Sequence, residues 1–194
     1  MLRLTGGIFK GRKLKTPEGL ISRPTSNKVR MALFNILQDE IINSTWLDLF
    51  SGVGTIGIEA LSRGALNAIF VENNYKTISC LYYNIEKLQL SEKTKIYKKN
   101  VIDFLKNCNL KVDFIFIDPP YKENHLYLET LNIIMEKDLL QEKGIIIVEH
   151  YTKFNIKEIK FLKLLKQYVY GDTLLSFFQL LKFNTIYLQE NKNN

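Results

Sequence analysis

The sequence predicts an α/β fold in which a mostly parallel sheet carries helices on both faces. Between residues 45 and 149, short apolar runs alternate with segments whose apolar residues recur at helical spacing. Alternation of this kind builds parallel sheets, because each helix crosses over the sheet between two strands. Near the end of the chain, apolar and aromatic runs over 161–170 and 173–180 flank Gly171-Asp172. This pattern indicates a hairpin that adds an antiparallel strand to the sheet.

The chain begins with a basic segment that we expect to form a β-hairpin over residues 2–16. Apolar and basic residues alternate over Leu2-Arg3-Leu4, and Gly6-Gly7 indicates a turn or bulge. Residues 8–14 then return with a basic outer face.

A loop over 17–24 separates the hairpin from the first expected helix. Thr25-Ser26-Asn27 offers N-cap side chains, and the apolar residues of 28–40 fall on one helical stripe. From residue 45 on, the expected strands cover 45–50, 67–71, 95–98, 112–118 and 144–149, and the expected helices cover 55–63, 75–88, 102–107 and 126–136.

The formal net charge of +7 comes from the first 30 residues. They hold eight basic residues and one acid, whereas the other 164 residues hold 19 basic and 19 acidic residues. A basic segment on a neutral body favours a polyanion that docks on one side, and the apolar residues between these charges argue against a merely solvated tail. We therefore expect RNA or DNA contacts from Arg3, Lys10, Arg12, Lys13, Arg23, Lys28 and Arg30.

Composition bounds the class of protein. The 194 residues suffice for one domain with a small appendage, and 46% hydrophobic content is ordinary for a globular protein. No apolar run reaches the length of a membrane span, and the N-terminal segment lacks the apolar region of a secretory signal. We expect a cytoplasmic monomer with no membrane partner. Metal-ligand spacing is absent among the cysteines and histidines, so we expect no metal site; they are Cys80, Cys108, His125 and His150.

The most informative motif is Asp118-Pro119-Pro120-Tyr121, which follows the apolar run 112–117. Two successive prolines remove two N–H donors and hold the backbone rigid at the carboxyl end of a strand. The carbonyl groups and the Asp118 carboxylate remain as hydrogen-bond acceptors beside an aromatic ring. These groups suit a planar partner that carries an NH2 group, such as a nucleobase, although an ordinary strand-ending turn has the same pattern.

A second motif is a G-x-G-x-x-G loop over 52–57 that follows the first strand and opens a helix. Glu72 ends the next strand 20 residues after Gly52, so the loop alone favours NAD and a dehydrogenase. Asp48 argues against NAD, because its carboxylate would repel a pyrophosphate with no metal to offset the charge. S-adenosylmethionine carries a sulfonium and an ammonium group and no phosphate, so it suits these acids better.

Each residue of this second site then has an expected role. Asp48 and the backbone after it bind the amino acid end of S-adenosylmethionine, Glu72 accepts the ribose hydroxyls, and Asn100 accepts from the adenine amino group. The first two glycines allow close approach of the backbone to the ligand. Capping of strand ends is the alternative for the acids. The expected cofactor residues are Asp48, Phe50, Gly52, Gly54, Glu72, Asn100 and Asp118.

Together the two motifs resemble those of class I methyltransferases. Residues 48–54 are similar to methyltransferase motif I, and residues 118–121 to the (D/N/S)PP(Y/F/W) motif of enzymes that methylate exocyclic amino groups. Three further segments are similar to the bacterial 16S rRNA (guanine-N2) methyltransferases of the RsmD type: Gly6-Gly7 with 10–14, Arg23-Pro24-Thr25 with 29–35, and Tyr170-Gly171-Asp172-Thr173. The chain departs from this family at Asn100, where members often have Asp, and in its apolar tail after Leu180.

The resemblance implies a Rossmann-like, seven-stranded class I methyltransferase sheet over 41–190, with 1–40 as an RNA-binding appendage. It implies methyl transfer from S-adenosylmethionine to N2 of one guanine in small-subunit rRNA, on an assembled or assembling 30S particle. Asp118 and the Pro119 carbonyl would accept from the guanine amino group, and Tyr121 would stack on the extruded base. The alternatives are another amino methyltransferase acting on DNA adenine or protein glutamine, an NAD-dependent reductase, and a non-catalytic RNA-binding assembly factor.

Overall fold

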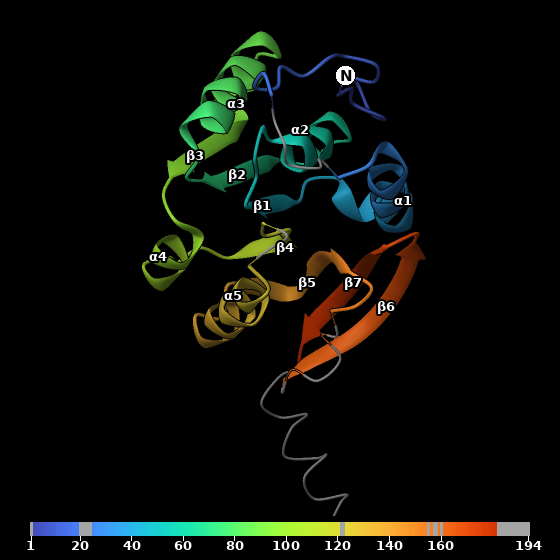
Figure 1. Ribbon diagram of the computed structural model, residues 1–194, viewed down its shortest axis with the longest axis vertical. Coiled ribbons are helices and arrows are strands. Elements are labelled where there is room, and N and C mark those ends of the chain that lie inside the picture. The colour runs from blue at the N-terminus through green and yellow to red at the C-terminus, as the bar shows by residue number, and fades with distance from the viewer. Residues whose placement is uncertain are drawn as a thin grey trace, which may run out of the picture.

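A computed structural model describes residues 2–19, 25–120, 123–154, 156, 159 and 161–181 of the chain. Within these residues, seven strands form one mixed sheet in the order β3-β2-β1-β4-β5-β7-β6 (Figure 1). The strands are β1 (Thr45–Leu49), β2 (Asn67–Glu72), β3 (Thr94–Lys98), β4 (Val112–Ile117), β5 (Leu140–Tyr151), β6 (Leu162–Tyr170) and β7 (Thr173–Leu180). The α-helices are α1 (Asn27–Leu37), α2 (Thr55–Ser62), α3 (Tyr75–Lys87), α4 (Val101–Lys106) and α5 (His125–Glu136).

The order of the strands confirms the predicted sheet. β1 lies between β2 and β4 in parallel pairing, with Asp48 in register with Phe70 on one side and Phe116 on the other. The first and fourth strands are therefore neighbours at the switch point, as the sequence predicts. β7 runs antiparallel to both β5 and β6, which confirms the terminal hairpin.

Two hydrophobic layers cover the sheet, because side chains alternate between its faces along each strand. On β1, Trp46 packs into one layer with α1, α2 and α3, whereas Leu47 and Leu49 pack into the other with α4 and α5. The two layers bury the central strands β1, β2 and β4 on both faces, and near-continuous apolar strands are the expected composition there, whereas β6 is largely exposed.

The predicted N-terminal hairpin forms only in part. Arg3 and Lys13 make a single antiparallel bridge instead of two regular strands. The segment lies along α2: Ile8 N–H donates to the carbonyl of Ser62 at 2.8 Å, and a Cβ on Gly7 would lie 1.9 Å from that carbonyl oxygen. The glycine is thus required by close packing as well as by the turn. Leu2, Leu4 and Leu14 belong to the α1–α3 layer of the core. The division of the chain into an appendage over 1–40 and a methyltransferase domain over 41–190 stays a prediction.

Some element boundaries differ from those expected. The helix predicted over 28–40 ends at Leu37, where Gln38 takes a φ of 44°, and continues as a 3₁₀ turn over Gln38–Ile41. β5 begins at Leu140 and runs through Gly144, so the glycine does not start the strand. In the described part of the chain, no helix has the length and apolar character needed to cross a membrane.

Candidate functional site

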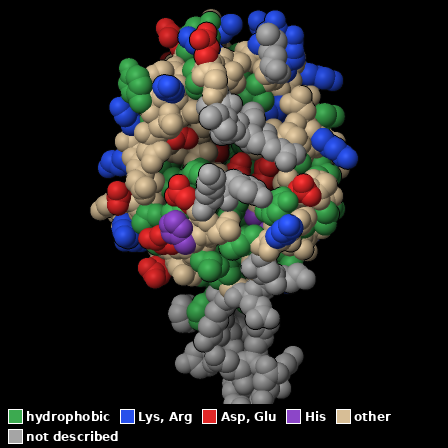
Figure 2. All heavy atoms as spheres, viewed as in Figure 1, with side chains coloured by type: hydrophobic (Ala, Val, Ile, Leu, Met, Phe, Trp, Pro, Cys, Tyr) green, Lys and Arg blue, Asp and Glu red, His purple; other side chains and the backbone are tan. Residues whose placement is uncertain are grey.

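Acidic side chains gather near the carboxyl ends of β1, β2, β4 and β5. The pairing of β4 with β5 stops at Ile117 and Val148, and Asp118 and Glu149 are the next residues after these two. The negative charges of Glu149 and Asp48 both act on Asp118. Figure 2 shows acidic side chains inside a hollow near the middle of the molecule. The sheet thus brings the two predicted motifs together.

Asp48 is a buried carboxyl group with 2% of its surface exposed. Its Oδ2 accepts a hydrogen bond from the N–H of Gly57 at 2.9 Å, in the first turn of α2. Burial raises the pKa of Asp48 to about 7, the Gly57 N–H opposes this rise, and the charge of Glu72 adds to it. A cationic ligand beside Asp48 would favour the ionised form and would be bound by it.

The glycines of the loop after β1 serve different purposes. Gly52 has a φ of 55°, and a Cβ there would meet no atom within 4 Å. Gly54 has a φ of 82°, but a Cβ on it would lie 2.3 Å from Leu81 Cδ1, and one on Gly57 would lie 2.4 Å from the Phe70 ring. Gly52 therefore borders open space where a ligand can approach, whereas Gly54 and Gly57 are required for packing of the helices against the sheet.

Glu72 is held by backbone donors at the end of β2. Its Oε2 accepts from Gly52 N–H at 2.7 Å, and its Oε1 accepts from Asn73 and Asn74 N–H at 2.9 and 2.8 Å. The carboxylate is half-buried and fixed against the loop. Each oxygen can accept more than one bond, so Glu72 can also accept the hydroxyls of a ribose.

Phe50 and Asn100 complete the predicted cofactor residues. Phe50 follows β1 with a φ of 58° and packs partly against the layer that contains α4 and α5. Asn100 is exposed, and its Oδ1 accepts from Ile102 N–H at 2.8 Å as the N-cap of α4. This side chain therefore has a helix-capping role, and its contact with adenine stays a prediction.

Asp118 follows β4, with Pro119 buried and Pro120 exposed beside it. Burial and the charges of Glu149 and Asp48 raise the pKa of Asp118 well above its ordinary value. Hydrogen-bond donors on a substrate would stabilise the ionised form of this carboxyl group, so Asp118 is suited to bind such donors. Tyr121 lies outside the described residues.

Five of the predicted RNA-binding residues are exposed, and one is not. Arg30 has 0% of its surface exposed, and its Nε lies 2.6 Å from Glu59 Oε2 in a buried ion pair. It also donates to the Arg3 carbonyl and the Asn27 side chain. The prediction for Arg30 is wrong: its position on the inner stripe of α1 commits it to the core. Arg23 lies outside the described residues, and the exposed set is Arg3, Lys10, Arg12, Lys13 and Lys28.

Sequence reasoning missed a buried amide that joins the predicted RNA-binding segment to the predicted cofactor loop. Asn84 of α3 is 1% exposed; its Oδ1 accepts from Lys15 N–H at 2.7 Å. Its Nδ2 donates to the carbonyls of Lys15 and Val53 at 3.1 and 3.2 Å. One side chain thus links the basic N-terminal segment to the glycine loop. The signal was an asparagine on the apolar stripe of a helix, between Leu81 and Ile85.

Comparisons relate the sequence and the fold of this chain to known proteins. The family model described as Conserved hypothetical protein 95 matches residues 2–179. YlbH of Bacillus subtilis, named as a candidate rRNA methyltransferase, is 37% identical over 160 residues, which are 81% of this chain and 86% of that protein. Ribosomal RNA small subunit methyltransferase D of Escherichia coli K12 is 34% identical over 148 residues, 76% of this chain and 74% of that protein. The solved structure of the Escherichia coli protein yhhF, titled as a candidate methyltransferase, has a TM-score of 0.83 at 28% identity and covers 93% of this chain and 98% of its own.

Proposed function

Because this chain belongs to the Conserved hypothetical protein 95 family, the family of the RsmD-type rRNA methyltransferases, we propose that it methylates N2 of a guanine in small-subunit rRNA. The observation that carries the proposal is the meeting of Asp48 and Glu72 with Asp118 at the carboxyl edge of a class I methyltransferase sheet. The substrate is a 30S particle, assembled or assembling, and the protein acts as a cytoplasmic monomer.

The residues at the carboxyl edge fit S-adenosylmethionine, the cofactor of this fold. Asp48 supplies a buried negative charge, and Gly52 leaves open space in the direction of its missing side chain. Glu72 supplies an acceptor held in place by three backbone N–H groups. When bound, S-adenosylmethionine supplies an electrophilic methyl group on a sulfonium. The buried carboxyl group of Asp48 would oppose the phosphates of NAD, which argues against a reductase.

The role of Asp118 follows from the chemistry of the guanine amino group. The N2 lone pair is delocalised into the ring, so the nitrogen is a poor nucleophile. Asp118 and the Pro119 carbonyl accept from its two N–H groups, which favours a pyramidal nitrogen whose lone pair points out of the ring plane. Positioning and electrostatic stabilisation then supply most of the rate.

No strong base is required at this site. The nitrogen becomes acidic once the methyl group has been transferred, so its proton can leave afterwards. His150 is not needed as a base. It is buried, and its Nε2 lies 2.8 Å from Ser176 Oγ, which indicates a structural role. Burial lowers the pKa of His150, which favours the uncharged ring.

Methyl transfer from labelled S-adenosylmethionine to unmodified 30S subunits tests the proposal. Free rRNA and duplex DNA serve as parallel substrates, and the modified RNA is digested to nucleosides. The proposal expects N2-methylguanosine from the subunit. Label in DNA or in protein would favour another amino methyltransferase, and cofactor binding without any transfer would favour a non-catalytic assembly factor.

A further inference from the structure

The outer face of α3 exposes aromatic rings toward solvent. Tyr75, Tyr82 and Tyr83 are 70%, 52% and 43% exposed, although tyrosines are commonly packed on at least one side. The helix is roughly 20 Å long at the usual rise per residue. Two of the rings mark its two ends, since Tyr75 begins the helix and Tyr83 lies in its last turns.

Lysine side chains lie over both of these rings. Lys15 Nζ and Lys87 Nζ lie 4.7 and 5.5 Å from the centroid of the Tyr83 ring, and Lys98 Nζ lies 5.0 Å from that of Tyr75. The ring faces attract the ammonium groups, which restrains flexible cations on the surface. Each end of α3 therefore presents an aromatic ring together with at least one positioned positive charge.

The end of α3 at Tyr83 adjoins the basic N-terminal segment. A pocket of about 260 Å³ lies there, with three positive charges around it; it is lined by Gly11, Arg12, Lys13, Lys87 and Leu88. An anionic group can enter this pocket without contact with an acidic lining residue. The basic N-terminal segment and α3 thus form one continuous surface.

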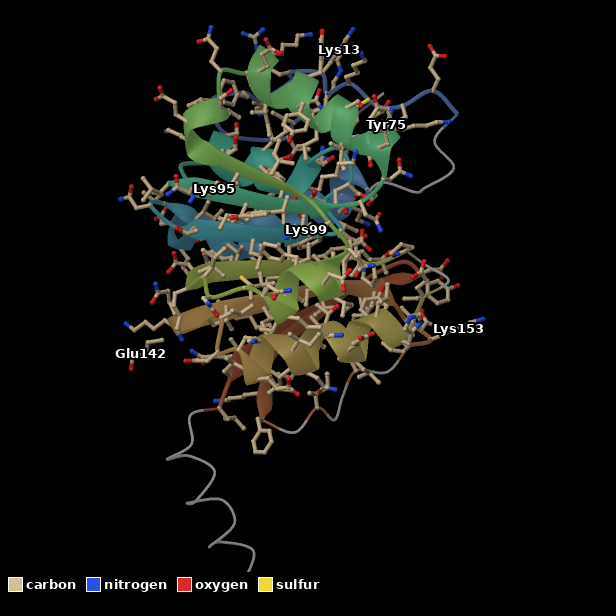
Figure 3. All side chains as sticks on the ribbon, turned by 90° about the vertical axis from the view of Figure 1, so that its left-hand side faces the viewer. Lys13, Tyr75, Lys95, Lys99, Glu142 and Lys153 are labelled. Atoms are coloured by element: carbon tan, nitrogen blue, oxygen red, sulfur yellow. The ribbon has the colours of Figure 1, made fainter. Side chains whose placement is uncertain are left out.

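The other end of α3 adjoins the candidate cofactor site. Lys98 is in register with Glu72 across β2 and β3, and Tyr75 follows Glu72 by three residues. Figure 3 shows Tyr75 near the same end of the strands as Lys153, which follows β5, and shows Lys95 and Glu142 at the opposite end. The path along α3 therefore runs from the N-terminal segment to the edge of the sheet where the carboxylates lie.

The charge of this region identifies the chemistry of its partner. Residues 75–99 contain six lysines and two glutamates, a net charge of +4, so the body of the protein is neutral overall but not locally. Positive charge that tracks a backbone, combined with exposed rings on which bases can stack, is the pattern of proteins that bind single-stranded nucleic acid. A protein partner would need an acidic surface to match these lysines, whereas the phosphates of a nucleic acid supply negative charge at every nucleotide.

We propose that an unpaired rRNA strand binds along α3, between the N-terminal segment and the carboxyl edge of the sheet. This surface, the α3 surface, consists of Lys15, Tyr75, Tyr83, Lys87 and Lys98. The phosphates of the bound RNA contact the lysines, and its bases stack on Tyr75 and Tyr83. The inference rests on the proposed function, because it gives the rRNA a route to Asp118.

Binding of labelled RNA to the full chain tests the α3 surface. The probe is an unpaired RNA of about 16 nucleotides, the upper site size of single-strand-binding folds, measured by fluorescence anisotropy at several salt concentrations. The variants are Tyr75→Ala with Tyr83→Ala, Tyr75→Phe with Tyr83→Phe, and Lys87→Ala with Lys98→Ala. Lys143→Ala, an exposed lysine on β5, is the charge control. Thermal melting confirms that each variant folds, and calorimetry follows S-adenosylmethionine affinity.

The Tyr→Ala pair should weaken RNA binding by roughly 10-fold or more, as expected when stacking is lost, with S-adenosylmethionine affinity unchanged. The Tyr→Phe pair should bind within about 2-fold of wild type, because the rings remain. The Lys87→Ala and Lys98→Ala pair should lower the salt slope by roughly 1.4, the value for two single-strand phosphate contacts, and Lys143→Ala should leave it unchanged.

The experiments distinguish a wrong assignment of the α3 surface from a wrong proposed function. If the α3 variants bind RNA as wild type does while Lys10→Ala, Arg12→Ala and Lys13→Ala together weaken binding, the α3 surface is overturned and the rRNA methyltransferase stands. If the Tyr→Ala pair loses methylation of 30S subunits with unchanged affinity for RNA, the surface contacts a ribosomal protein and the RNA assignment is overturned. A wild-type chain that neither binds nor methylates RNA overturns both.

Discussion

Glu72 accepts a hydrogen bond from the N–H of Gly52 at 2.7 Å, which ties the end of β2 to the loop after β1. Two further N–H groups, of Asn73 and Asn74, fix its other oxygen. The carboxylate is therefore preorganised at the sheet edge before any ligand arrives. A carboxylate held in this way can bind the hydroxyl groups of a ribose, and its side chain loses little conformational entropy on binding.

Glu72→Gln should weaken S-adenosylmethionine binding by at least ~10-fold, because a hydrogen bond to a charged group contributes about 1.5–3 kcal/mol. Isothermal titration calorimetry measures the effect. Glu129→Gln, an exposed acid on α5, is the matched control and should bind the cofactor as wild type does. Equal affinities for the Glu72 and Glu129 variants would remove Glu72 from the ribose site.

Asp48 makes stability depend on pH. Its pKa in the folded protein is about 7, above the ordinary value of 3.8, so the neutral form is favoured by folding. The stability from this preference is fully present below the ordinary pKa and is lost as the pH rises through about 7. Asp48→Asn cannot ionise, so its unfolding free energy relative to wild type should rise between about pH 5 and about pH 8.

Urea unfolding at both pH values measures this difference, and calorimetry measures the cofactor. S-adenosylmethionine affinity of the wild type should increase over the same range as Asp48 ionises, whereas that of Asp48→Asn should be weak and nearly constant. A parallel pH dependence in the two proteins would show that Asp48 is not the titrating group.

The buried ion pair between Arg30 and Glu59 should matter far more than an exposed one. Glu59→Gln leaves the guanidinium of Arg30 without its charge partner in the core, which typically costs about 3–5 kcal/mol. Asp138→Asn breaks the exposed pair with Lys111 and should cost less than about 1 kcal/mol. Urea unfolding compares the two variants. Similar losses in both would mean that Arg30 and Glu59 are not an essential core pair.

Gly7→Ala should detach the N-terminal segment from α2. The new Cβ would lie 1.9 Å from the Ser62 carbonyl oxygen, in addition to the strain of a φ of 72°. Gly19→Ala has a similar φ of 67° but open space around it, so it carries only the backbone penalty of about 1–2 kcal/mol. Gly7→Ala should lose at least about 1 kcal/mol more, the scale of overpacking. Equal stability of the two variants would contradict the packing seen at Ser62.

The sequence predicts the order of the elements better than their contacts. The strands and helices from residue 45 follow from periodicity, since each apolar run must be buried between two layers. The role of Arg30 could not be read in this way, because a basic residue on a helix has the same signal whether it faces RNA or a buried acid. The choice depends on Glu59, 29 residues further along the chain, which periodicity does not relate to α1.

The site shows the same division. Asp48, Glu72 and Asp118 are recognisable because acids at strand ends must meet at one edge of a parallel sheet. Glu149 was not recognised, although it lies near the carboxyl end of the neighbouring strand and raises the pKa of Asp118, because it lacks a motif of its own. The α3 surface was hidden by the neutral charge of the body, in which the lysines of 75–99 are balanced by acids elsewhere.

The most direct test of the account is methyl transfer to 30S subunits by Asp118→Ala, measured together with S-adenosylmethionine affinity. Asp103→Ala, an exposed acid on α4, is the control. The account predicts that Asp118→Ala loses at least ~100-fold in turnover, the scale of one lost transition-state contact. Cofactor affinity should change little, because Asp48 and Glu72 remain to bind the cofactor although Asp118 borders it, and the Asp103 variant should be unaffected. Turnover near that of wild type would show that Asp118 only ends a strand, and it would contradict the proposed mechanism.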